Sequence, residues 1–515
     1  MNVTADIQHL IFKRAIGDSA ANLATWKDRL VLLAVCREWR ALALPLAYRQ
    51  AFICSNIYHS HCALAPAEAK PSTNLDLLQA NHGAELVRVL EIELVHTVGL
   101  EVFLAHAVRL LQRGRWQRVT SLKLRVYAGS DDARRPGECD PVLAHYARWL
   151  RRLLPAVARL AVSGGCGGAS AELLGRVANA YARQLTRLHA DVPLALAAKH
   201  ASAELTHLKL GFSAHASQSL PRIAAQTLVR LELYGLGGAF PWTRFSAGPH
   251  APHVIRFDNL RCLEVSYGAA FADDAHEMRD ANSRVPGLEL HFPKLQRLRI
   301  AQCPPDCVLL AAGRFPEFLA QARIYGSARA VELVERSRLR RMGRLAINVH
   351  ALDAAAHADF YRATGRLLGA ASAQAACASL YVARHVVLAH PELADWGRLT
   401  KLLVMSPLEA RHMLRLLARL PALLSFVSFR TDVADVARCC SQAVAPEPRA
   451  HRLERLGVIY DADTCLESEA RALLEYLLVQ LGNLHTFTVP DAHLQLAKKA
   501  ARRLNQGKVA FKGHW

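Results

Sequence analysis

A short apolar pattern recurs along most of the chain, and it constrains the fold more than any other feature of the sequence. Each copy has the form apolar-x-x-apolar-x-apolar, and the middle positions of successive copies lie 20 to 38 residues apart. That interval straddles the length of one strand plus one helix, as expected of a repeat array. The middle positions are Leu122, Leu208, Leu231, Leu263, Leu298, Leu345, Leu402, Leu456 and Phe487 in the clear copies, and Leu90, Leu160, Leu188, Ala322, Leu380 and Phe426 in the poorer ones.

Each copy is predicted to form a short β-strand, because alternate side chains of a strand point to opposite faces. The apolar positions would enter a core, and the charged residues between them would point outward, as at Arg230, Glu232, Arg297 and Arg299. Strands of successive repeats are expected to pair in parallel. A single copy can arise by chance in a leucine-rich chain, but the alternation of strands with helices along the chain favours a true array.

Helical spacing between many of the strands predicts helices that cover the sheet. The two best examples are residues 409–420 and 468–478, and proline and glycine mark the returns at Pro407, Pro421 and Gly482. The apolar face of the first helix is predicted at Met413, Leu416, Leu417 and Leu420.

We therefore predict an α/β fold, a leucine-rich-repeat-like solenoid with a parallel sheet plus helices over residues 54–515. Polar insertions near residues 236–258 and 268–292 are expected to project from it as loops. Among the clear copies only Cys303 occupies the position where such repeats often carry an asparagine or cysteine, so the array is expected to be irregular.

The first 53 residues do not fit the repeat and predict a small helical module. Ile7, Leu10, Ile11 and Ile16 form one helical stripe, and residues 30–39 form a second apolar helix. One interpretation of this segment is a helical cap that seals the first repeat, since solenoids need capped ends.

Specific residues of this segment support a second interpretation. The order Asp6-Ile7-x-x-x-Ile11-Phe12, followed by Val35-Cys36-x-x-Trp39-Arg40 and a trailing Leu-Ala, Pro and Tyr-Arg, resembles an F-box, although Val3-Thr4 stands where that family usually has Leu-Pro. Irregular leucine-rich repeats are a common companion of the F-box, especially in fungal-type members. The positions matched for adaptor binding or F-box packing are Ile7, Ile11, Phe12, Val35, Cys36, Trp39, Pro45 and Tyr48.

The resemblance implies the substrate-recognition subunit of an SCF-type cullin-RING ubiquitin ligase. In such a complex the F-box binds a Skp-type adaptor and the repeats hold the target protein for ubiquitination, so the receptor itself is not an enzyme. Two alternatives stay open: a protein-interaction scaffold without adaptor binding, and a basic solenoid that binds nucleic acid. The identity of the target protein is not encoded in any motif of the sequence.

Composition and charge limit the cellular location and the kinds of partner that we expect. No run of 18 or more apolar residues is present and no secretory signal is visible at the first residues, so we expect a cytoplasmic or nuclear protein with no membrane partner. The formal charge is +20, but Arg outnumbers Lys by 52 to 12 in an alanine-rich chain, a bias that GC-rich codons produce. The charge is therefore weak support for a nucleic-acid partner.

Motifs for catalysis, metals and cofactors are not found. Residues 164–168 are rich in glycine but lack the Gly-Lys-Ser/Thr of a phosphate-binding loop, and no Gly-x-Ser-x-Gly or His-Glu-x-x-His sequence occurs. Cys54, His59, His61 and Cys62 could ligate zinc by number, yet a strand explains the segment without metal. We therefore expect no catalytic residue, no metal site and no cofactor.

Overall fold

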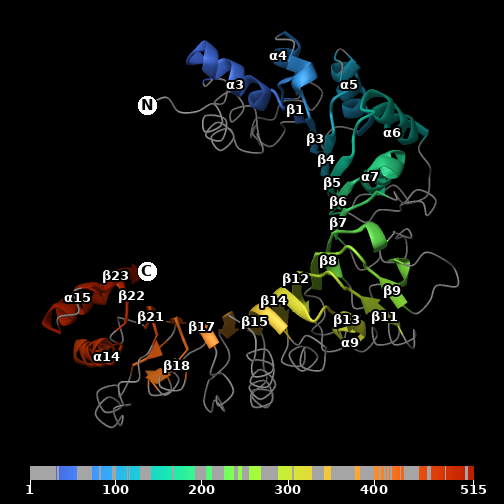
Figure 1. Cartoon of the computed structure of the whole chain (residues 1–515). Helices are drawn as coiled ribbons and strands as arrows, with labels where there is room; N and C mark the ends of the chain where they lie inside the picture. Colours follow the sequence, from blue (N-terminus) through green and yellow to red (C-terminus); the bar gives the residue numbers. More distant parts are fainter. Residues whose placement is uncertain are drawn as a thin grey trace. The chain divides into compact units, whose positions relative to one another are not determined.

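The computed structural model describes most of the chain. The described residues are 31–54, 72–127, 141–191, 204–211, 225–236, 242–245, 254–267, 288–326, 341–349, 377–382, 399–433 and 452–514, with short gaps inside several of these ranges. The chain divides into two compact units, the N-terminal unit Met1–Pro252 and the C-terminal unit His253–Trp515. Each unit is α/β, with a parallel sheet and accompanying helices (Figure 1).

In the described part of the N-terminal unit, seven strands pair in parallel and in chain order. A two-residue strand, β2 (Ser72–Thr73), adds antiparallel to the first of them. A sequential parallel order of this kind is compatible with a solenoid. The seven strands are β1 (Gln50–Cys54), β3 (Val89–Val95), β4 (Ser121–Tyr127), β5 (Arg159–Gly164), β6 (Arg187–Ala190), β7 (His207–Gly211) and β8 (Arg230–Leu236).

The predicted repeat positions explain why these strands align. The middle residues of six predicted copies pair one with the next across β3 to β8, and each is at most 4% exposed. Burying one leucine side chain stabilises a fold by roughly 1.5–3 kcal/mol, so a register shifted by one residue, which turns these side chains to the other face, would lose several such contributions. The six residues are Leu90, Leu122, Leu160, Leu188, Leu208 and Leu231.

Helices cover one side of this sheet, as Figure 1 shows for α5, α6 and α7. Strand β5 ends at Gly164, where a Cβ atom would lie 1.7 Å from the carbonyl oxygen of Val126, so the close approach of β4 and β5 requires glycine there. The helices of this unit are α3 (Arg37–Ala47), α4 (Leu75–Ala80), α5 (Leu100–Gln112), α6 (Pro141–Leu153) and α7 (Gly168–Tyr181), with 3-10 turns η3 (Gly83–Leu86), η4 (Ala182–Gln184), η7 (Ala225–Thr227) and η8 (Trp242–Phe245).

The C-terminal unit contains a larger sheet of ten described parallel strands, again in chain order. All nine repeat positions predicted here fall within them. The strands are β10 (Cys262–Tyr267), β12 (Arg297–Cys303), β14 (Phe318–Gly326), β15 (Arg341–Val349), β16 (Cys377–Val382), β17 (Leu399–Val404), β19 (Ser425–Ser428), β21 (Arg455–Val458), β22 (Thr486–Pro490) and β23 (Ala510–His514).

One register change interrupts the alignment of the predicted positions. Leu345 on β15 pairs with Ala378 on β16, whereas Leu380 pairs with Ile347. The shift is two residues, and because side chains alternate with a period of two, the same set of positions stays on each face.

Two small parallel sheets accompany the large one. β9 (Val254–Arg256), β11 (Glu289–His291) and β13 (Gly313–Arg314) form the first, and β18 (Leu408–Glu409) pairs with β20 (Thr431–Asp432) in the second. Residues 236–258 and 268–292 were predicted as loops, but each range contains a short strand near its C-terminal end, β9 in the first and β11 in the second. The aromatic rings that follow the three strands of the first sheet stack on one another at 5.0 and 5.6 Å; they belong to Phe257, Phe292 and Phe315.

Described helices of the C-terminal unit are α9 (Val308–Ala312), α14 (Glu467–Gln480) and α15 (Leu494–Arg503), with the 3-10 turn η10 (Asp491–His493). α14 confirms the helix predicted at residues 468–478. In the other predicted helix, Ala410, Met413 and Leu417 are helical and buried, while Glu409 belongs to β18. Among the helices of the described ranges, none is both long and apolar enough to cross a membrane.

A candidate anion-binding surface on the N-terminal unit

The residues matched to an F-box fall partly outside the described chain. Ile7, Ile11 and Phe12 lie outside the described residues. Tyr48 follows α3 and is buried, and its ring occupies the space where a side chain at Gly83 would lie. Tyr48 therefore anchors the end of α3 on the N-terminal unit.

The other described members of this set lie at α3. Cys36 is the N-cap, and its sulfur accepts a 3.4 Å hydrogen bond from the backbone N–H of Trp39. Val35 and Pro45 are exposed and Trp39 is half-buried. The predicted boundary between residues 53 and 54 falls inside β1, which pairs with β3.

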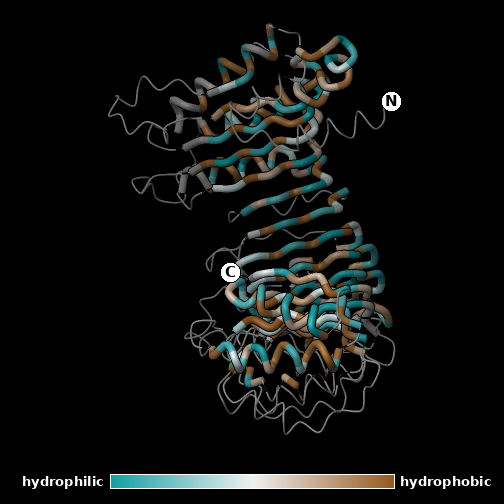
Figure 2. The backbone as a smooth tube through the Cα atoms, turned by 90° about the vertical axis from the view of Figure 1, so that its left-hand side faces the viewer, coloured by the Kyte–Doolittle hydropathy of each residue, from teal (hydrophilic) through white to brown (hydrophobic). Residues whose placement is uncertain are grey.

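The open side of the N-terminal sheet carries a row of basic side chains. Arg159, Arg187, His207 and Arg230 pair one with the next on β5, β6, β7 and β8, and we call these four residues the basic row. Their neighbours along the strands are buried leucines, so alternation places the basic row on the opposite face. Figure 2 shows the same alternation of hydrophilic and hydrophobic positions along the strands.

A second row runs beside it, two residues further along each strand. It starts and ends with a carboxylate, at Glu91 and Glu232, and contains Lys123, His189 and Lys209 between them. The two rows therefore differ in charge, since a carboxylate stands at each end of the second row and none occurs in the first.

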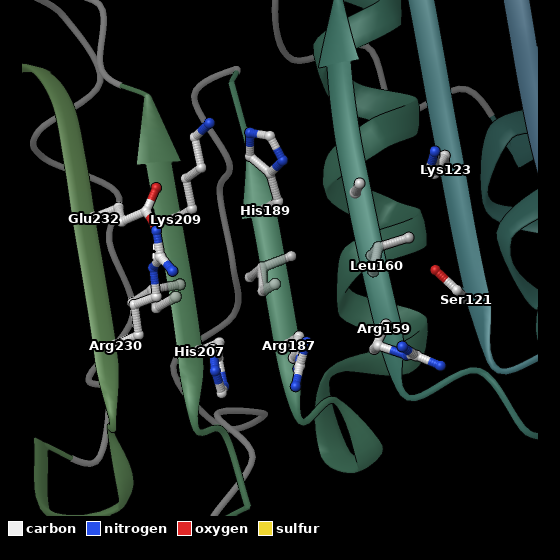
Figure 3. Close-up of a pocket in the computed structure, with 13 residues that line it drawn as sticks. Ser121, Lys123, Arg159, Leu160, Arg187, His189, His207, Lys209, Arg230 and Glu232 are labelled. Carbon is white, nitrogen blue, oxygen red and sulfur yellow. Dashed lines mark hydrogen bonds and ion pairs between the residues drawn. The ribbon is translucent and has the colours of Figure 1, made fainter. Parts of the chain in front are cut away.

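The basic row and all of the second row except Glu91 line a shallow hollow of about 270 Å³ over β4 to β8 (Figure 3). Five of the lining side chains are lysine or arginine, two are histidine and one is a carboxylate. The lining residues are Ser121, Lys123, Arg159, Leu160, Ala161, Arg187, Leu188, His189, His207, Leu208, Lys209, Arg230 and Glu232.

Carboxylates neutralise only some of these cations. Lys123 forms an ion pair with Glu91 at 3.5 Å, and Arg230 forms one with Glu232, which also accepts a 2.9 Å hydrogen bond from Tyr234. These pairs lie at the two edges of the hollow.

Arg159 on β5 and Arg187 on β6 have no such compensation among the described contacts. The guanidinium of Arg159 donates a 3.1 Å hydrogen bond to the neutral hydroxyl of Thr120. Arg187 is exposed, and within the described part of the chain it forms no ion pair. A positive charge therefore stands at the middle strands of the hollow.

Burial and nearby positive charge together lower the pKa of His207 below its usual value of 6.5. Burial is the largest cause, and repulsion from Arg187 and Arg230 adds to it, while Glu232 opposes the shift. Thr206 donates its hydroxyl proton to the carbonyl of Thr186 at 3.0 Å, so its oxygen accepts from Nδ1 of His207 at 2.9 Å. The other ring nitrogen, Nε2, is then the atom that gains a proton.

The arrangement is suited to binding anions. Guanidinium groups present several N–H donors that match carboxylate or phosphate oxygens. Among the residues lining the hollow, Ser121 carries the only hydroxyl. No group of three or more His, Cys, Asp and Glu side chains that could hold a metal ion is present in the described ranges.

Cys54 and Cys303, which the sequence singled out, and the neighbouring Cys307 are half-buried or buried. Cys303 and Cys307 are buried, and Sγ of Cys307 lies 3.2 Å from the hydroxyl of Tyr267. Burial, and to a smaller degree Glu93 and Glu91, raises the pKa of Cys54 to about 11, which keeps its thiol protonated. His59, His61 and Cys62 lie outside the described residues.

Sequence reasoning placed Arg230 and Glu232 on the outer face but did not bring the basic row together. The four residues come from segments up to 71 positions apart, and only the strand register aligns them. The available signal was the residue just before each middle leucine, which is basic in four successive copies.

Comparison with known proteins adds no assignment. No protein-family model matches the chain, and no curated protein is significantly similar to it.

Proposed function

We propose that this protein is a non-catalytic binding protein of the leucine-rich-repeat type that recruits a target protein. The observation that supports this most is the open strand face of the N-terminal unit, on which aligned strands present side chains in straight rows. Such a face offers many contacts to a partner, whereas its hollow is shallow and lacks a clustered set of nucleophile and base.

We further propose that the module at residues 1–53 acts as an F-box and binds a Skp-type adaptor. Two observations agree with this role. The α3 segment is held on the unit by the buried Tyr48, and Val35, two residues before α3, leaves 57% of its apolar side chain exposed. An exposed valine at a position matched to adaptor contact is consistent with burial against a partner.

The complete proposal is a substrate-recognition subunit of an SCF-type cullin-RING ubiquitin ligase, acting in the cytoplasm or nucleus. The module would connect the chain to the adaptor and cullin, and the repeats would hold the target. The protein would then perform no chemistry itself and need no cofactor.

The proposal is tested by co-purification of the full chain with a Skp-type adaptor and its cullin. A Val35→Asp variant is the informative change, because Val35 is exposed and its replacement leaves the core intact. Val479→Asp on α14 is the matched control, since that valine is 58% exposed and belongs to the C-terminal unit.

We expect adaptor binding by the wild type and by Val479→Asp, and a loss of at least tenfold in Val35→Asp with an unchanged circular dichroism spectrum. No adaptor binding by the wild type would refute the ligase assignment and leave the alternative of an interaction scaffold. Equal binding by all three forms would place the adaptor contact elsewhere.

A further inference from the structure

The length of the basic row sets the length of an extended ligand that could bind along it. Neighbouring strands in a sheet lie about 4.8 Å apart, so the row from Arg159 on β5 to Arg230 on β8 spans about 14 Å. In an extended peptide, side chains on one face are about 6.7 Å apart, and three of them span about 13 Å. Three alternate acidic residues of a peptide crossing the strands therefore match the row.

The donors needed for such a ligand are present at the middle strands. Arg187 is exposed without an ion pair to a described residue, and Arg159 uses its guanidinium only on the hydroxyl of Thr120 among the contacts described. Hydrogen bonds from charged donors to carboxylates are roughly twice as strong as neutral ones. A carboxylate placed between these two arginines would relieve the repulsion between them.

The boundaries of the positive region favour a short acidic segment over a nucleic-acid strand. Glu91 and Glu93 lie on the strand beyond β4, and Glu232 and Asp191 lie beside the row on β8 and at the end of β6. A continuous phosphate backbone crossing the sheet would also pass Glu91 and Glu93, whereas a short acidic segment that spans β5 to β8 ends before it reaches β3.

We propose that the basic row of the N-terminal unit binds an extended, carboxylate-rich segment of a partner protein, with three acidic residues at alternate positions spread along the row from Arg159 to Arg230. This inference rests on the proposed function, because it names the chemistry of the target that the repeats hold. The ligand of the hollow is thus an acidic peptide, and the test below compares it with nucleic acid.

Peptide binding is coupled to protonation of His207. In the free protein its ring faces Arg187 on β6, Arg230 and Glu232 on β8, and the Thr206 hydroxyl on its own strand, with His189 and Lys209 lining the same hollow. A bound carboxylate cancels the repulsion from the two arginines and raises the pKa of His207. Binding therefore takes up a proton, and affinity rises as pH falls from 7.5 to 6.

The test measures fluorescence anisotropy of labelled octapeptides with the full chain at low salt. One peptide carries glutamate at every second position and serine between, and a second carries glutamine in place of glutamate. A labelled oligothymidylate with the same number of charges is the nucleic-acid probe.

Arg187→Glu is the informative variant and Arg183→Glu is its matched control. Arg183 is an exposed arginine of η4 in the same unit, four residues away and outside the hollow. We expect the glutamate peptide to bind the wild type and Arg183→Glu within twofold of each other, and to bind Arg187→Glu at least tenfold more weakly. The His207→Gln variant is expected to bind without the pH dependence between 7.5 and 6.

Three results would overturn the inference: no binding of the glutamate peptide, equal binding of the glutamine peptide, or equal binding by Arg187→Glu. Tighter binding of the oligothymidylate, lost in Arg187→Glu, would assign the row to nucleic acid instead. The adaptor co-purification is independent of these measurements. If the glutamate peptide does not bind, the ligase proposal is unaffected, and if the adaptor does not bind, the proposed peptide site is unaffected.

Discussion

The side-chain amide of Gln50 on β1 donates a 2.8 Å hydrogen bond to the carboxylate of Glu91 on β3. Both residues are buried, at 4% and 6% exposure, next to the first strands of the N-terminal sheet. Lys123 and Arg125 on β4 complete the surroundings of Glu91, at 3.5 and 3.2 Å. One carboxylate thus ties three successive strands together.

Glu91→Gln is therefore expected to destabilise the N-terminal unit by about 1–3 kcal/mol, because it removes the charge that two cations and a buried amide require. Urea unfolding followed by circular dichroism measures the loss. Glu93→Gln is the control: its side chain is 24% exposed and its contact with Arg125 is longer, at 3.8 Å, so its loss should stay under about 1 kcal/mol. Equal losses for the two variants would contradict this account.

Cys54 should react with alkylating reagents only at high pH. Burial raises the pKa of its thiol to about 11, from the usual value of 9, with smaller contributions from Glu93 and Glu91. The thiolate is the reactive form, so alkylation should rise between pH 10 and 12 rather than near 9. Peptide mapping by mass spectrometry measures this against the exposed Cys36.

The variant Glu93→Gln removes one of the charges that disfavour the Cys54 thiolate. We expect the alkylation profile of Cys54 to move to lower pH in that variant while the profile of Cys36 stays unchanged. A profile that does not move would mean that Glu93 does not contribute to the raised pKa of Cys54.

Tyr181 connects two helices of the same unit. Its hydroxyl donates a 2.7 Å hydrogen bond to the carbonyl of Leu150 on α6, and its ring is fully buried beneath the guanidinium of Arg151 at 5.3 Å. Leu150 keeps its helical bond from Leu154, so Tyr181→Phe should cost only about 1 kcal/mol. Tyr181→Ala, which also leaves a cavity, should cost about 3–5 kcal/mol in the same urea assay. Similar losses for the two variants would show that the ring contributes little.

The strands could be predicted because their signal is local. All fifteen predicted middle positions lie in parallel strands, since alternation of apolar and polar residues within six positions is enough to specify a strand with one buried face. Strand β23 lacks the full pattern and was not predicted, although Phe511 of β23 pairs with Phe487 of β22. The small sheet of β9, β11 and β13 was hidden because each of its strands is only two or three residues long.

The candidate site could not be predicted in the same way. Whether Arg159 lies beside Arg187 depends on the register between β5 and β6, and that register is set by Leu160 and Leu188 on the other face. The same alternation would allow Arg187 to face position 161 after a shift of two residues, as occurs between β15 and β16. Only the packed structure decides between these arrangements.

A cluster of charged side chains on the small sheet of β9, β11 and β13 allows a pH-dependent prediction for the C-terminal unit. Glu289 on β11 accepts a 2.6 Å hydrogen bond from Arg314 on β13 and lies 2.9 Å from Nε2 of His291. These hydrogen bonds lower the pKa of Glu289 from 4.5 to about 2, Arg314 being the larger cause.

Because the pKa of Glu289 is lower in the folded protein, its interactions stabilise the small sheet above pH 4.5 and are lost as pH falls toward 2. The carboxyl carbon of Glu289, followed by NMR in a selectively labelled chain, should titrate near pH 2. In Arg314→Ala the pKa should return most of the way toward 4.5, and in His291→Ala the change should be smaller. A larger change in His291→Ala than in Arg314→Ala would reverse the order of the two partners.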